Sequence, residues 1–268
     1  MNIITKNNFK LESNTFLLIN KPEGWTSFDV VGYIRKIFRQ QNPEVKKPRV
    51  GHAGTLDPFA TGLLIVAIGR EATREIENFK NLPKTYEATI KLGEVSNTGD
   101  KTGVITPFKL SSLKKIILDI KYWILKIFSN NIQYPISSIH PYVPSKLEIE
   151  KILIKFIGSQ NQIPPMFSAK KIDGQRLYKL ARLGKKIKRK ANKIEIFDLQ
   201  ILGYQYPVLK ITVTCSPGTY IRTLAEDIGK KLNTRAYCQE LKRTKIGDYD
   251  LKDAMCLTSV LRPQATKN

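Results

Sequence analysis

Two segments with strictly alternating side chains constrain the fold of this chain more than any other feature. In KTYEATIKLG, residues 84–93, apolar side chains fall on every second position, and VLKITVTC, residues 208–215, repeats the pattern. A period of two is typical of strands with one buried face and one exposed face. The chain is therefore expected to build a sheet that is covered on one side.

Helical patterns lie between the expected strands. Residues 27–38 carry apolar side chains at helical spacing behind Ser27, the expected N-cap, and residues 219–232 do the same behind Thr219. A short apolar strand is expected at 16–22. Strands joined by both turns and helices predict an α+β fold with a mixed, mainly antiparallel sheet flanked by helices and loops.

The 268 residues fit one large domain with appendages. We expect a body over residues 1–247, interrupted by an extra helical insertion at about 108–145 and a basic loop at 163–193. Residues 248–268 form a short C-terminal tail. The insertion is apolar nearly all round, and a peripheral helix packed on the body is favoured over a membrane anchor, since no apolar run reaches the roughly 20 residues of a span.

The net charge of +22, from 45 Lys and Arg against 23 Asp and Glu, indicates a polyanionic partner, nucleic acid before membrane. A lysine bias from an A+T-rich genome is the alternative, but it explains the clustered arginines less well. The 3 cysteines lack C-x-x-C spacing, which favours reduced thiols in the cytoplasm over disulfides or a zinc site.

The segment GHAGTLDPFATG holds a single carboxylate, Asp57, among small residues. Metal catalysis is not expected, because His52 and His140 lie far apart without acidic neighbours, and the G-x-S-x-G, phosphate-loop and dinucleotide-loop patterns are missing. A lone carboxylate can be a covalent nucleophile if a nearby cation keeps it ionised. An Asp-Pro pair can equally start a turn, and spacing alone leaves both readings open.

Five segments in order carry a family resemblance: LLINKPEGWTSFDVV, GHAGTLDPFATGLLIVAIGREATR, KTYEATIKLG, IPPMFSAKKIDGQRLYKLAR and SPGTYIRTLAEDIG. Together they resemble the bacterial tRNA pseudouridine-55 synthases, the TruB family, over most of residues 16–247. The resemblance implies the pseudouridine synthase fold. It also implies an isomerase that uses no cofactor and no metal, and that converts the T-loop uridine at tRNA position 55 to pseudouridine.

The resemblance also assigns roles to individual residues. Asp57 matches the catalytic aspartate, whose attack leads to glycosidic bond cleavage, rotation of the uracil and reattachment through C5. Tyr86 matches a tyrosine that stacks on the flipped base, and Arg222 matches the arginine that pairs with the catalytic carboxylate. His52 matches a histidine that enters the space left by the flipped nucleotide. The other matched substrate-binding positions are Tyr220, Leu241 and Lys21.

Residues 163–193 correspond to the mobile thumb loop of the family, which closes over the T arm of tRNA. The residues expected to contact RNA there are Phe167, Lys170, Lys171 and Arg182. A monomer acting without guide RNA is expected. The insertion and the short tail depart from the family pattern, since the tail leaves no room for a full C-terminal RNA-binding domain. Two other readings remain: a catalytic subunit steered by guide RNA, and a non-catalytic tRNA folding chaperone.

Overall fold

The computed structural model describes residues 2–4, 11–108, 142–168, 170–172, 174–185 and 187–257, with the backbone alone at 2–4, 171, 172, 176, 179 and 182. Most of the insertion expected at 108–145, and the tail beyond residue 257, lie outside this part. No helix within it is both long and apolar enough to cross a membrane.

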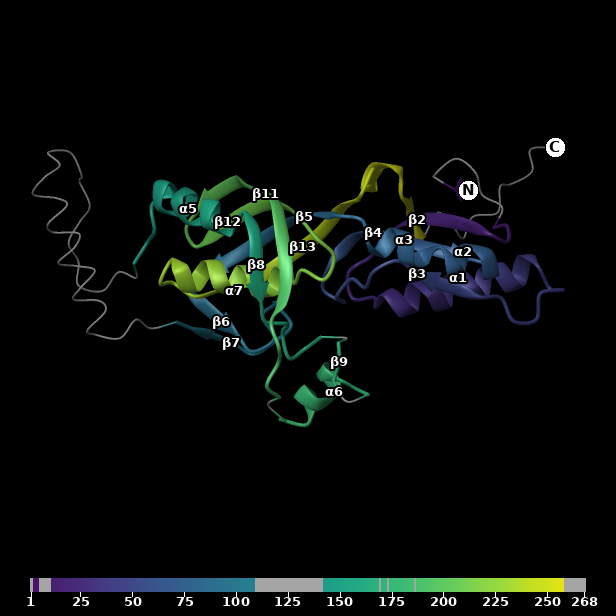
Figure 1. Ribbon diagram of the computed structural model, residues 1–268, viewed down its shortest axis with the longest axis horizontal. Coiled ribbons are helices and arrows are strands. Elements are labelled where there is room, and N and C mark those ends of the chain that lie inside the picture. Colours follow the sequence, from purple (N-terminus) through teal and green to yellow (C-terminus); the bar gives the residue numbers. More distant parts are fainter. Residues whose placement is uncertain are drawn as a thin grey trace, which may run out of the picture.

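Eleven strands of the described residues form one sheet that runs along the length of the molecule (Figure 1). Most neighbouring strands are antiparallel, whereas β13 with β4 and β2 with its two short neighbours are parallel. The predicted mixed, mainly antiparallel sheet is therefore confirmed. The main path is β1 (Asn2–Ile4), β2 (Thr15–Lys21), β4 (Thr61–Ile68), β13 (Ala236–Ile246), β5 (Lys84–Leu92), β12 (Val208–Cys215), β11 (Asn192–Gln205) and β8 (Gly158–Gln162).

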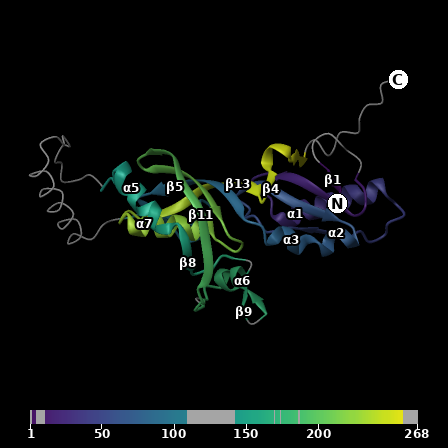
Figure 2. The same cartoon turned by 45° about the horizontal axis from the view of Figure 1, so that its top comes forward.

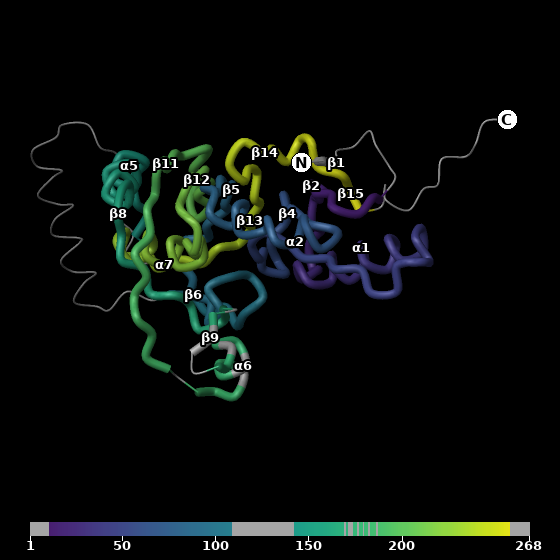
Figure 3. The backbone as a smooth tube through the Cα atoms, turned by 45° about the vertical axis from the view of Figure 1, so that its right-hand side comes forward, coloured from purple at the N-terminus to yellow at the C-terminus, as the bar shows by residue number. Residues whose placement is uncertain are grey.

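Three short strands extend this path: β3 (Val50–His52) beside β4, β14 (Tyr249–Asp250) beside β13, and β15 (Met255–Cys256) beside β2. Figure 3 shows how β1, β2 and β15 lie together although they come from opposite ends of the chain. The two alternating segments of the sequence are β5 and β12, which pair along their whole length.

The sheet has two halves that meet at a narrow junction. Strands β4 and β13 pair through two positions only, Lys242 with Thr61 and Arg243 with Gly62. Gly62 has φ of +105°, and a Cβ there would lie 2.3 Å from the backbone oxygen of Arg243. Only glycine allows strands to approach so closely in this backbone conformation. The segment GHAGTLDPFATG leads directly into this junction.

In one half, helix α7 (Ile221–Lys231) and helix α5 (Lys146–Leu153) pack with β5, β12 and β13 around one apolar core (Figures 1 and 2). The apolar side of α7 was predicted, but its cap was not. Tyr220 is the N-cap, without a side-chain cap bond, while the Thr219 hydroxyl donates to the Ser216 carbonyl instead. The predicted Thr219 cap is wrong.

In the other half, β2 and β4 are covered on both faces. Helix α1 (Ser27–Gln41) packs on one face, and the short helices α2 (Arg70–Arg74) and α3 (Ile76–Lys80) pack on the other. The predicted Ser27 cap is wrong by one residue, because Thr26 forms a capping box with Asp29. This shift frees the Ser27 hydroxyl for a different task in the site.

Two further segments carry strands that lie outside the main sheet. The hairpin of β6 (Glu94–Ser96) and β7 (Ile105–Pro107) follows β5. The predicted thumb segment contains β9 (Lys171–Ile172), β10 (Gln175–Arg176) and helix α6 (Leu177–Arg182). These last elements project away from the sheet, on the side where α7 lies (Figures 1 and 2).

Candidate active site

The loop that carries Asp57, residues 53–60, is held on both sides of the aspartate. The Ser27 hydroxyl accepts from the Leu56 amide at 2.8 Å and donates to the Leu56 carbonyl at 3.2 Å. The Pro58 carbonyl accepts from the Gly24 amide at 2.8 Å. These contacts tie the loop to the beginning of α1, so that the backbone around Asp57 is fixed before any substrate binds.

Arg222, in the first turn of α7, binds Asp57 with two nitrogens. Nε donates to Oδ2 at 2.9 Å and Nη2 to Oδ1 at 3.2 Å. The side chain of Arg222 is 4 % exposed and that of Asp57 is 34 % exposed, so the arginine lies beneath a carboxylate that remains accessible. A bidentate pair of this kind fixes the orientation of the carboxylate as well as its charge.

The remaining donors of Arg222 are also occupied. Nη1 donates to the Thr98 carbonyl and Nη2 to the Phe167 carbonyl, each at 2.8 Å. Nη1 also lies 3.3 Å from a second carboxylate, Asp100. The guanidinium therefore connects the loop that carries Asp57, the segment after β6 and the beginning of the predicted thumb segment.

Asp100 is a site residue that the sequence analysis missed. Its Oδ1 accepts from the Thr102 amide at 2.9 Å and the Thr98 hydroxyl at 2.9 Å, as a turn aspartate does. The segment SNTGDKTG indicates such a turn, but the contact with Arg222 bridges 122 positions of sequence. Only the tertiary fold shows that this aspartate faces the arginine.

Two opposing effects act on the pKa of Asp57. Burial raises the pKa above its ordinary value, and the Arg222 guanidinium lowers it. The Asp100 carboxylate adds to the upward shift, because two like charges share one arginine. The net result is a pKa above the ordinary value, and Arg222 limits that rise.

Lys21, at the end of β2, is fully buried, and its Nζ donates to the Pro22 and Trp25 carbonyls at 2.7 Å and to Pro58 at 3.3 Å. Burial lowers the pKa of Lys21 to about 8, although the charge of Asp57 opposes the shift. The structure thus places this predicted site residue close to Asp57, where its hydrogen bond to Pro58 supports the loop that carries Asp57.

Apolar side chains form the wall next to Asp57. Tyr86 on β5 is 9 % exposed and packs in one cluster with Leu56, Phe59 and Leu241. The backbone partners of Tyr86 and Ala88 on β13 are Arg243 and Leu241. Burial raises the pKa of Tyr86, and the positive charge of Arg243 partly opposes that rise, so that Tyr86 is a neutral phenol at neutral pH.

Tyr220 stands at the start of α7. Its amide donates to the Gln162 side chain at 2.7 Å, and its carbonyl accepts from the same side chain at 3.0 Å. Burial raises the pKa of the Tyr220 hydroxyl, and the charges of Asp57 and Arg222 act on it as well. The structure therefore brings the predicted residues Asp57, Tyr86, Tyr220, Arg222, Leu241 and Lys21 to one place.

The remaining predicted site residues are His52 and four residues of the predicted thumb segment. His52 is half-buried on β3, and its pKa is lowered first by burial and then by the charge of Arg243. Phe167 contacts Arg222 through its carbonyl, and the Lys170 Nζ donates to the Asn192 side chain at 2.7 Å. Lys171 lies on β9 and Arg182 on α6, but their side chains are outside the described part of the chain.

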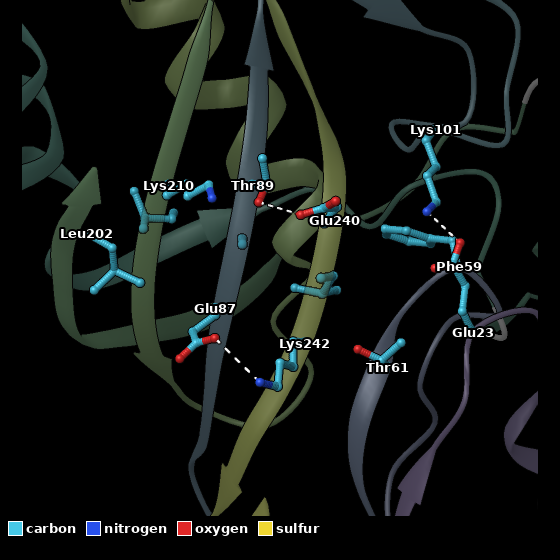
Figure 4. Close-up of a pocket in the computed structure, with 13 residues that line it drawn as sticks. Glu23, Phe59, Thr61, Glu87, Thr89, Lys101, Leu202, Lys210, Glu240 and Lys242 are labelled. Atoms are coloured by element: carbon cyan, nitrogen blue, oxygen red, sulfur yellow. Dashed lines mark hydrogen bonds and ion pairs between the residues drawn. The ribbon is translucent and has the colours of Figure 1, made fainter. Parts of the chain in front are cut away.

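A pocket of about 360 Å³ lies beside the site (Figure 4). Phe59 and Leu241 line it, together with outward-facing side chains such as Glu87, Lys210 and Glu240. These last residues alternate along their strands with those that face α7, so the pocket lies on the opposite side of the sheet from α7. Because Asp57 does not line it, we do not assign the pocket to the reaction.

Family profiles match nearly the whole chain. The profile of the TruB family pseudouridylate synthase N-terminal domain matches residues 35–138 and 135–221, and that of the tRNA pseudouridylate synthase B C-terminal domain matches residues 222–267. The chain is 40% identical over 245 residues to tRNA pseudouridine synthase B of Parabacteroides distasonis, covering 90% of this chain and 88% of the relative. It is 41% identical over 253 residues to that of Phocaeicola vulgatus, covering 94% and 93%.

Solved structures share the fold. The chain matches a Cbf5-Nop10-Gar1 complex with a TM-score of 0.56 at 22% identity, covering 91% of this chain and 52% of the other. It matches an H/ACA ribonucleoprotein bound to a substrate RNA containing 2′-deoxyuridine with a TM-score of 0.57 at 21% identity, covering 91% and 51%. At this level of identity the likeness concerns the fold alone.

The mixed sheet and the likeness to these solved structures show that the chain has the pseudouridine synthase fold. With the profile matches and the close relatives, the chain belongs to the TruB family of pseudouridylate synthases. The family resemblance seen in the sequence is confirmed.

Proposed function

We propose that this protein converts the T-loop uridine at position 55 of tRNA to pseudouridine. The observation that carries the proposal is the bidentate pair of Asp57 and Arg222, which presents one accessible carboxylate at the junction of the sheet. The names of the close relatives, all tRNA pseudouridine synthase B, support the same reaction.

In the proposed reaction, the Asp57 carboxylate attacks the nucleotide. It does so at C1′ of the ribose or in another step that leads to cleavage of the glycosidic bond. The bond between C1′ and N1 breaks, and its electron pair stays on the uracil. The base rotates, and C5 forms a new bond to C1′ while the bond between the Asp57 oxygen and C1′ breaks and returns its electron pair to the carboxylate. The C5 proton then leaves, its bonding pair restores the ring double bond, and N1 takes up a proton from water.

The surrounding residues have supporting roles in this proposal. Tyr86 stacks on the flipped uracil and takes part in proton transfer, while Leu241 and Tyr220 complete the surroundings of the base next to Asp57. Arg222 keeps Asp57 ionised and oriented. His52 fills the gap that the flipped nucleotide leaves in the RNA stack.

Recognition of the substrate follows from charge and shape. The net charge of +22 supports binding of an RNA backbone, and the thumb segment 163–193 closes over the T arm. Phe167, Lys170, Lys171 and Arg182 are the proposed RNA contacts there. We propose a monomer in the cytoplasm, with residues 1–247 as its catalytic body, that acts without guide RNA.

Product analysis tests this proposal. A tRNA transcript is incubated with the purified protein alone, digested to nucleosides and analysed for pseudouridine by chromatography and mass spectrometry. We expect one pseudouridine per tRNA, lost when uridine 55 is replaced by cytidine. Conversion that needs an added guide RNA would favour the guided subunit, and tight binding without conversion would favour the chaperone.

A further inference from the structure

Arg243 is a fully buried cation near the site, and no role is yet assigned to it. Its side chain lies inside the junction of the two sheet halves and is among the largest fully buried side chains of the described residues. Nε donates to the Leu63 carbonyl at 2.7 Å, and Nη2 to the Gly54 carbonyl at 3.1 Å. Arg243 therefore contacts the loop that carries Asp57 at Gly54 and the strand that follows this loop, β4, at Leu63.

The local backbone directs Arg243 toward Tyr86. The two residues are direct partners on β13 and β5, and side chains at such positions point to the same face of a sheet. The register of β13 against β5 shifts between Cys238 and Glu240 and again between Arg243 and Lys245. Bulges of this kind turn a side chain away from its regular direction. The positive charge of Arg243 lowers the pKa of the Tyr86 hydroxyl, against the burial that raises it.

The charge of Arg243 has no carboxylate partner among the described residues. Every ion pair found in that part of the chain involves another cation. The nearby ionisable groups of Lys21, Lys84 and His52 would gain positive charge on protonation, and the charge of Arg243 lowers the pKa of each. A buried arginine stays charged, and a buried charge without a counter-ion is costly. Such a site suits a group that becomes negative during the reaction.

We propose that Arg243 is a positioning residue that holds and stabilises the Tyr86 oxygen as the acceptor of the proton leaving C5. This inference rests on the proposed function. Tyr86 first releases its hydroxyl proton to water, and the resulting phenolate is the transient negative charge that Arg243 faces. The C5–H bond then breaks, its electron pair returns to the ring, and the proton forms a new O–H bond on Tyr86.

A kinetic isotope effect separates this role from a purely structural one. Single-turnover conversion is measured on tRNA that carries hydrogen or deuterium at C5 of uridine 55, for wild type and Arg243→Met. We expect the rate to fall about a hundredfold, the lower end of what positioned proton transfer contributes to catalysis. The isotope effect should increase, because C5 deprotonation becomes the slow step. If the Tyr86 phenolate accepts the proton, the rate rises with pH as Tyr86 ionises. Loss of the Arg243 charge should move this rise to higher pH.

The matched control is Lys84→Met. Lys84 is a buried neighbour whose Nζ donates to the Phe79 carbonyl at 3.3 Å and the Leu82 carbonyl at 2.5 Å, so its loss should leave the isotope effect unchanged. If Arg243→Met does not fold, as judged by circular dichroism, the same measurement is made on Arg243→Lys. This variant keeps the positive charge and loses the paired donors of the guanidinium.

An Arg243 variant that is slower with an unchanged isotope effect and pH profile would overturn the inference. Arg243 would then act only by holding the backbone at Gly54 and Leu63. Failure of the proposed function gives a different result: the wild-type protein itself would then form no pseudouridine.

Discussion

At the scale of single residues, the ionisation of Asp57 depends on two partners that act in opposite directions. Burial and Asp100 raise its pKa, and Arg222 lowers it. Because the proposed nucleophile is the carboxylate, activity is lost as the pH falls through the pKa of Asp57. Changes to either partner should therefore move the acid limb of the pH–rate profile in predictable directions.

Arg222→Met should move the acid limb to higher pH. Removal of the guanidinium takes away the effect that lowers the pKa of Asp57, so the pKa rises further above 3.8. We also expect a loss of rate of about a hundredfold or more from the misplaced carboxylate. The measurement is single-turnover rate against pH. Arg235→Met, at an exposed arginine that lies over Phe108, is the control and should leave the limb in place.

Asp100→Asn should move the same limb to lower pH. The amide keeps the size of the side chain but removes a negative charge that raises the pKa of Asp57. Arg222 loses one of its two carboxylates, and we expect the rate at neutral pH to fall about ten- to a hundredfold as its position relaxes. A limb that shifts upward instead would show that Asp100 does not act on Asp57 through charge.

At the scale of elements, local patterns predicted the strands well and the contacts between distant elements poorly. Alternation identified β5 and β12 because the signal lies within each strand. The cap of α7 was missed because the Tyr220 backbone is satisfied by Gln162, which lies 58 positions away on β8. Arg243 was missed for a related reason. In the sequence it follows Lys242 and is expected at the surface, but the pairing of β13 with β4 buries it.

Gly62→Ala should destabilise the protein at the junction of the sheet. The positive φ and the approach to the Arg243 backbone together should lower the free energy of unfolding by at least about 2 kcal/mol. Gly32→Ala in α1 is the matched control, since nothing lies within 4 Å of its added Cβ, and helix propensity predicts a gain of up to about 1 kcal/mol. Urea unfolding of both variants tests the difference; equal effects would contradict it.

At the scale of the whole molecule, the positive charge should set the strength of tRNA binding. Raising salt from about 50 to about 200 mM should weaken affinity on the order of a thousandfold, as counter-ions compete for the phosphates. If the thumb contacts the backbone, Lys185→Ala combined with Lys188→Ala should make the salt slope about 2 units shallower. The charge-matched control is Lys46→Ala with Lys47→Ala, in the loop after α1 (Figure 1). Equal slopes for both pairs would contradict a thumb contact.

The proposed reaction depends on the carboxylate of Asp57, and tritium release tests this dependence most directly. A tRNA transcript labelled with tritium at C5 of uridine is incubated with wild type and with Asp57→Ala, and a second transcript carries cytidine at position 55. Formation of the C5 bond expels the tritium, so we predict release by wild type only, and only from the first transcript. Release by Asp57→Ala at the wild-type rate would contradict the assignment of Asp57 as nucleophile.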